Sequence, residues 1–92
     1  MIVSAEVDCI IYEAQSLKEK RAVLKRIKTR LQNEFNIAVS ELDFQNLWQR
    51  TRLGLVTIAS DKVIAEQTMQ QALAFIDSFP EIERTETNQE WL

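Results

Sequence analysis

The sequence predicts an α+β fold in which six elements follow the order β-α-β-β-α-β. Three observations support this prediction. Two segments open with helix-capping residues and then show helical spacing of apolar side chains. Four segments around them alternate or are rich in β-branched residues, as strands are. The length of 92 residues suits one domain with a single core.

The first strand is predicted over residues 2–12, where apolar and polar side chains alternate. Its inward positions are Val3, Ala5, Val7, Cys9 and Ile11. The run Ser16-Leu17-Lys18-Glu19 then matches the capping box, in which the serine hydroxyl accepts a hydrogen bond from the amide of the glutamate. A helix is therefore expected to start after Ser16.

Apolar residues at helical spacing extend this helix to about residue 31 and continue on the same face just past its end. They are Leu17, Leu24, Ile27, Leu31 and Phe35. A second strand is predicted over residues 36–43 and a third over residues 52–60, where aliphatic and β-branched side chains dominate.

Ser60 and Asp61 open the second predicted helix, and Pro80 ends it. Its inward residues are Ala65, Met69, Ala72, Leu73 and Ile76. The last segment, residues 81–92, carries four acids and is typical of a charged edge strand, closed by an apolar Trp91-Leu92 pair. This order is that of a ferredoxin-like sandwich, a single domain over residues 1–92 with two helices on one face of an antiparallel sheet.

Cationic residues are concentrated in the first helix. Seven of the eleven lie between positions 18 and 30, although the chain has a net charge of −3. Four form one row beside the apolar stripe, namely Lys18, Arg21, Lys25 and Lys28. The row is about 15 Å long, enough to contact several phosphates, so we expect the outer helix surface to bind nucleic acid. The alternative is a solvated face whose methylene stems cover apolar surface.

The segment FQNLWQRT, between the second and third strands, holds an aromatic residue among amides and cations. Trp48 has the chemistry to stack on an unpaired base, and Arg50 and Arg52 would join the basic patch if this loop reaches the helix. The alternatives are that Trp48 closes the end of the core or forms a dimer contact.

Residue types that catalysis and cofactor binding require are scarce. The chain has no histidine, one cysteine and one glycine, which excludes the usual metal sites and glycine-rich phosphate loops. The carboxylate pairs Glu6 with Asp8 and Glu41 with Asp43 are interpreted as solvated outer-face residues, and Cys9 as a core thiol. We therefore expect a protein that is not an enzyme and has no cofactor.

Four segments together resemble the bacterial YlxP-like family, whose function is unknown. They are SLKEKR at 16–21, FNIAVSELDFQNLWQR at 35–50, LG at 53–54 and the closing EWL. The resemblance extends over nearly the whole chain. It implies a ferredoxin-like fold, a cytoplasmic bacterial setting, and genes that often lie among those for translation initiation and ribosome maturation.

The leading functional hypothesis is a small cytoplasmic binding protein that contacts RNA through the first helix, with ribosomal RNA or the small ribosomal subunit as partner. The alternative is a homodimeric protein-interaction module that uses the open sheet face, with Ile2 and Ile10, or the Trp48 loop. No segment predicts a secretory signal or a membrane span.

Overall fold

The computed structural model describes residues 1–92 and contains four strands and two helices. They are β1 (Ile2–Ile11), α1 (Leu17–Glu34), β2 (Ala38–Asp43), β3 (Arg50–Ile58), α2 (Lys62–Asp77) and β4 (Ile82–Trp91). The predicted element order is confirmed. β3 begins two residues earlier than expected, because its pairing with β1 continues to the pair of Ile10 and Arg50.

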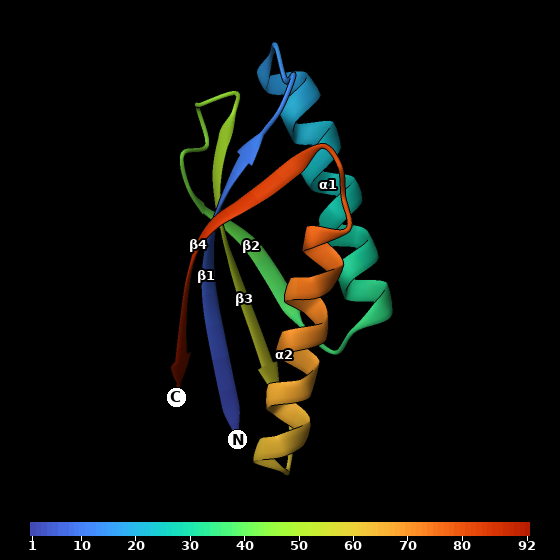
Figure 1. The fold of residues 1–92 in the computed structure, drawn as a ribbon, viewed down its shortest axis with the longest axis vertical. Coiled ribbons are helices and arrows are strands. Elements are labelled where there is room, and N and C mark those ends of the chain that lie inside the picture. The colour runs from blue at the N-terminus through green and yellow to red at the C-terminus, as the bar shows by residue number, and fades with distance from the viewer.

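The four strands form one antiparallel sheet in the order β2-β3-β1-β4. Both helices lie side by side on the same face of this sheet (Figure 1). The predicted α+β ferredoxin-like arrangement is therefore confirmed. β1 is central and pairs with β3 and β4, so β2 and β4 are the edge strands, as predicted for the acidic C-terminal segment.

The core lies between the sheet and the helices and follows the predicted patterns. The alternating inward side chains of β1, from Val3 to Ile11, are all buried. On α2 the five predicted inward residues are the buried ones. Cys9 is buried as a free thiol, and burial raises the pKa of this thiol to about 12, which keeps it protonated at neutral pH.

Side chains cap both helices where the sequence predicted helix starts. The Ser16 hydroxyl accepts from the Glu19 amide at 3.0 Å, and the Glu19 carboxylate accepts from the Gln15 amide at 2.7 Å. Asp61 accepts from the amides of Val63 and Ile64 at the start of α2. Each cap satisfies amides that have no partner inside the helix, which defines where the helix begins.

The two ends of the molecule differ in what they present. The β2–β3 loop and the beginning of α1 lie at the same end, at the top of Figure 1, and both chain termini lie toward the other. This arrangement brings the Trp48 segment near the first turns of the basic helix. No helix is both long and apolar enough to cross a membrane.

Candidate nucleic-acid interface

The four cations predicted to form a row on α1 have no carboxylate partner. Lys18, Arg21 and Lys25 are exposed and Lys28 is partly exposed. No Asp or Glu oxygen lies within 4.0 Å of their charged groups, whereas five other pairs in the protein meet that distance. The row therefore presents uncompensated positive charge.

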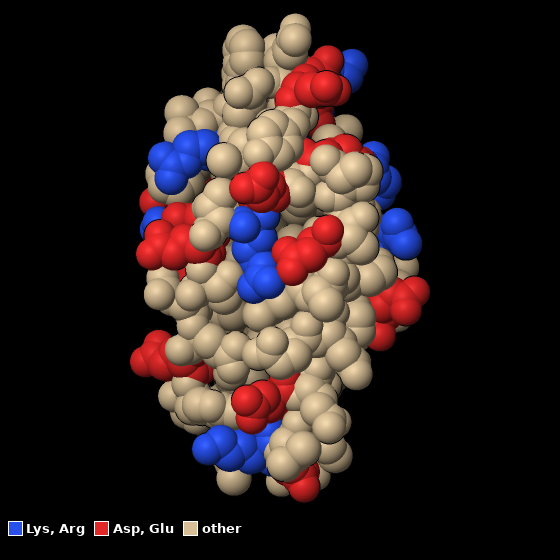
Figure 2. Space-filling model, viewed as in Figure 1, with Lys and Arg blue, Asp and Glu red and all other residues tan.

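The opposite flank of α1 is occupied by contacts with neighbouring elements. Arg26 forms an ion pair with Glu81, and the Arg30 guanidinium lies 5.2 Å from the ring centres of both Phe75 and Phe79. Since Phe75 belongs to α2, this flank faces the second helix, and the row lies on the flank away from it. In Figure 2, cationic groups project from the right-hand margin, where Figure 1 shows α1.

Counting Lys20, one of the seven cations between positions 18 and 30, toward an outer surface is wrong. Its side chain is fully buried, and its ammonium group lies 2.9 Å from a carboxylate oxygen of Glu41. The reason is its position on the helix, because Lys20 is three residues after Leu17 and four before Leu24 and so falls on the apolar stripe. That spacing was the signal in the sequence that could have identified it.

The prediction that Glu41 is a solvated outer-face residue is also wrong. Glu41 lies on the helix side of β2 and is 17% exposed, and it accepts from the Thr51 hydroxyl at 2.6 Å as well as pairing with Lys20. Thr51 is itself buried. A lysine from α1, a glutamate from β2 and a threonine from β3 thus form one polar network beneath the helix layer, and each charge in it has a partner.

Lys20 also fixes the start of the β2–β3 loop. Its ammonium donates to the carbonyl oxygen of Phe44 at 2.5 Å, and the same oxygen accepts from the Leu47 amide at 3.0 Å. Phe44 has a φ of 64°, a left-handed conformation that few residues other than glycine adopt without support. Further along, the Gln49 side chain donates to the Ala14 carbonyl at 3.1 Å. The loop is therefore bound to α1 and to the segment before it.

Trp48 projects from this anchored loop and does not close the core. Half of its surface is exposed, and the neighbouring Leu47 is 46% exposed. A shallow cavity of about 420 Å³ lies among Asn46, Leu47, Trp48, Gln49 and Arg50. A large aromatic side chain on an anchored loop, next to amides and one cation, is suited to contact a flat ring or an apolar partner.

Arg50 and Arg52 do not join the row on α1. Both guanidinium groups lie over the Phe44 ring, at 4.2 and 5.2 Å from its centre. Arg52 donates to both carboxylate oxygens of Asp8, at 2.6 and 3.2 Å, and lies 3.6 Å from Asp43. The hydrogen bond from Arg52 holds the pKa of the Asp8 carboxyl below its usual range. The charge of Arg52 is thus largely compensated, on the sheet face opposite the helices.

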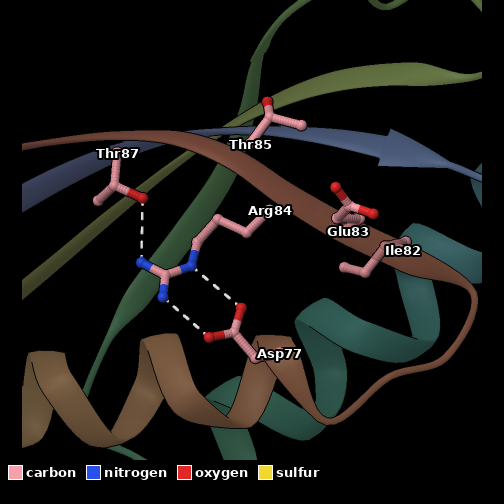
Figure 3. Close-up of a pocket in the computed structure, with 6 residues that line it drawn as sticks. All are labelled: Asp77, Ile82, Glu83, Arg84, Thr85 and Thr87. Atoms are coloured by element: carbon pink, nitrogen blue, oxygen red, sulfur yellow. Dashed lines mark hydrogen bonds and ion pairs between the residues drawn. The ribbon is translucent and has the colours of Figure 1, made fainter.

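A second hollow lies where α2 meets β4, and its charges are compensated internally. Arg84 donates two hydrogen bonds to Asp77, at 3.0 and 2.8 Å, and one to the Thr87 hydroxyl at 3.0 Å (Figure 3). The cavity measures about 540 Å³ and is open to solvent. Because each side of the guanidinium already has a partner, this cluster serves to join β4 to the end of α2.

Comparison with known proteins supports the resemblance noted in the sequence. The family described as "Protein of unknown function (DUF503)" matches residues 2–89. The chain belongs to this family. A relative, the uncharacterized protein YlxP of Bacillus subtilis (strain 168), is 60% identical over 91 residues, which is 99% of each chain.

Two solved structures show a similar fold at 17% identity each. The de novo designed protein Foldit4 superposes with a TM-score of 0.61 and covers 100% of this chain and 99% of its own. A C-terminal segment of the alpha subunit of aIF2 from Pyrococcus abyssi gives a TM-score of 0.54, covering 94% of this chain and 51% of that one. Both similarities concern the fold alone.

Proposed function

We propose that this protein is a cytoplasmic, noncatalytic RNA-binding protein that docks on ribosomal RNA or the small ribosomal subunit through the outer flank of α1. The observation that carries the proposal is the row of Lys18, Arg21, Lys25 and Lys28, none of which has a carboxylate partner. Other cations of the protein are paired with acids or lie over aromatic rings. A cation paired with an acid adds little attraction for phosphate, and the cations over aromatic rings, Arg30, Arg50 and Lys62, lie apart from one another on three different elements, so the row is the surface best suited to a polyanion.

The position of Trp48 extends this proposal to unpaired nucleotides. The row begins at Lys18, in the first turn of α1, and the Trp48 loop lies at the same end of the molecule (Figure 1). An RNA backbone that follows the row toward that end would approach the exposed indole ring of Trp48. Stacking on such a ring contributes about 1–3 kcal/mol per base and requires a base that is not paired. Single-stranded or looped regions of RNA are therefore the preferred ligand.

The test is a titration of fluorescent 16S-derived RNA fragments, and of small ribosomal subunits, across a salt series. Four phosphate contacts predict a slope of log K against log salt of roughly −3 to −4. Reversal of charge in Lys25→Glu/Lys28→Glu should weaken binding and flatten the slope to roughly −1 to −2. The matched control is Arg30→Glu/Lys62→Glu, which changes the net charge equally outside the row.

Three results would contradict the proposal. They are binding that is insensitive to salt, equal losses in the row variant and the control, and no binding to RNA or subunits at low salt. Trp48→Ala should weaken binding to unpaired RNA more than to duplex of the same length. Equal effects on both would remove base stacking from the proposal but leave the phosphate contacts.

The homodimer predicted as an alternative also has one observation in its favour. Leu47 and Trp48 are neighbouring large apolar side chains on an anchored loop, and both are about half exposed. Paired aromatic and aliphatic anchors are typical centres of protein interfaces. Sedimentation velocity of the wild-type protein and of Trp48→Ala tests this. A dimer that the substitution dissociates would support the alternative.

A further inference from the structure

The sheet face opposite the helices is left uncovered by every element of the fold (Figure 1). On β1 this face carries the residues that alternate with the buried ones, from Ile2 to Ile10. Their cross-strand partners lie on the same face, including Gly54, Val56 and Ile58 of β3 and Glu86 and Glu90 of β4. We call this surface the open sheet face.

One half of the open sheet face is an apolar strip along β2 and β3. It consists of Ala38, Leu42, Val56 and Ile58, together with Ile2 of β1, which pairs with Ile58. Leu42 and Ile58 are 46% and 60% exposed, which is high for aliphatic side chains inside strands. A groove of about 310 Å³ runs along this strip.

The floor of the groove depends on the absence of a side chain at Gly54. A methyl group added there would lie only 2.7 Å from Cδ1 of Leu42. The lack of a side chain allows Leu42 to lie over the bare backbone of β3. Ser4 and Ser40 flank the same position with small side chains, so the middle of the face is hollowed.

The other half of the face, on β1 and β4, is acidic, and three of its carboxylates have no ion-pair partner. Glu6, Glu86 and Glu90 lie there and form no ion pair. The cations at this face are Arg50 and Arg52, and Arg52 is already paired with Asp8 and Asp43. The face therefore combines an apolar strip with a parallel row of free carboxylates.

We propose that the open sheet face binds a cationic amphipathic segment of a partner protein, with its apolar side chains in the groove and its lysines or arginines on Glu6, Glu86 and Glu90. Charge complementarity selects this occupant. A second copy stacked on the same face would bring its own carboxylates and no free lysine, and buried carboxylates without partners are costly. RNA is repelled by the same carboxylates, so this site is independent of the proposed RNA interface.

The probe is an 18-residue helical peptide of leucine and lysine with an apolar face, compared with a version in which glutamate replaces lysine. Two-dimensional NMR of the labelled protein should show shifts confined to amides of the open sheet face, and only with the lysine peptide. The triple variant Glu6→Gln/Glu86→Gln/Glu90→Gln should weaken binding roughly tenfold, as three exposed ion pairs imply. Its matched control, Glu13→Gln/Glu34→Gln/Glu66→Gln, removes the same charge elsewhere and should leave affinity within about twofold.

The apolar half is tested separately. Val56→Ser/Ile58→Ser should weaken binding at least tenfold, whereas the equally polar Val63→Ser/Ile64→Ser on α2 should not. Equal losses in a variant and its control, shifts elsewhere on the protein, or no binding of the lysine peptide would overturn the proposal. A dimer that Val56→Ser/Ile58→Ser dissociates and the triple variant strengthens would overturn it in favour of a second copy.

Discussion

Lys20 shows how a single side chain can join three elements. Its ammonium group contacts Glu41 of β2 and the Phe44 carbonyl, and Glu41 in turn accepts from Thr51 of β3. A buried ammonium is tolerated only where its charge and hydrogen bonds are satisfied, and here a carboxylate and a carbonyl do so. The residue therefore matters for stability, and it is distinct from the exposed cations beside it.

The first prediction concerns this pair. Lys20→Met keeps the volume of the side chain but leaves Glu41 without a counter-charge, and should lower the free energy of unfolding by about 3 kcal/mol. Lys20→Met/Glu41→Gln, which retains the bond from Thr51, should recover more than half of that loss. Urea denaturation measures both, with the exposed Lys25→Met as control, expected within about 0.5 kcal/mol of wild type. A single variant as stable as the control would contradict the role of the pair.

Asp8 carries a pH-dependent contribution to stability. The hydrogen bond from Arg52 lowers the pKa of the Asp8 carboxyl in the folded state below its usual value of 3.8. The contribution is therefore fully present above about pH 4 and is lost as the pH falls through the lower folded value. Asp8→Asn should reduce Tm by about 4–8 °C at pH 7 for a pair worth about 1 kcal/mol. The difference from wild type should shrink toward zero at pH 2, as thermal melts at pH 7, 4 and 2 would show.

At the scale of the elements, the α2 cap yields a further prediction. Asp61 accepts from two amides of the first turn, so Asp61→Ala should lower the free energy of unfolding by about 1 kcal/mol, whereas Asp61→Asn should cost much less. Chemical denaturation followed by circular dichroism compares the two. If asparagine and alanine destabilised equally, the loss would be one of charge at the helix end and not of the hydrogen bond.

The fold could be predicted from the sequence because its signals are local. The capping patterns at Ser16 and Asp61, the alternation along β1 and the spacing within α2 each lie within one element, and all are confirmed. The candidate site was harder to predict because it depends on contacts between elements. Glu41 belongs to a strand with a predictable start and end, but its burial requires the ammonium of Lys20 from a helix twenty-one positions earlier.

The β2–β3 loop illustrates the same limit. Local composition could not show that Lys20 holds the Phe44 carbonyl, or that Arg52 belongs to the face opposite α1. Whether Arg50 and Arg52 join the basic row was therefore a question of strand register. The pairing of Asp8 with Arg52 across β1 and β3 answers it, because side chains paired in this way share one face.

At the scale of the whole molecule, charge divides by face although the net charge is only −3. The free cations lie on the outer flank of α1, and the free carboxylates Glu6, Glu86 and Glu90 lie on the open sheet face. The polyanion and the cationic protein segment that we propose as ligands would therefore contact separate surfaces of the molecule. Neither ligand would need to displace the other.

Cys9 permits a test of whether this small domain unfolds as a single unit. The thiol lies in the central strand, between β3 and β4, and burial raises its pKa to about 12. Alkylation requires the thiolate, and local fraying of an edge strand does not expose the centre of the core. Labelling by iodoacetamide at pH 8 should therefore depend on global unfolding. For a domain with a stability of about 5 kcal/mol or more, labelling should be at least about 10³-fold slower than in 6 M urea.

The dependence of this rate on stability makes the test decisive. If unfolding is cooperative, Lys20→Met and Asp61→Ala should each accelerate labelling by the factor that their equilibrium destabilisation implies, about tenfold per 1.4 kcal/mol. Their positions differ, one beneath α1 and the other at the start of α2, yet both should act on the same thiol. If only one of the two substitutions accelerates labelling, the two helices open independently of each other. In that case Cys9 is exposed by the opening of only one of them.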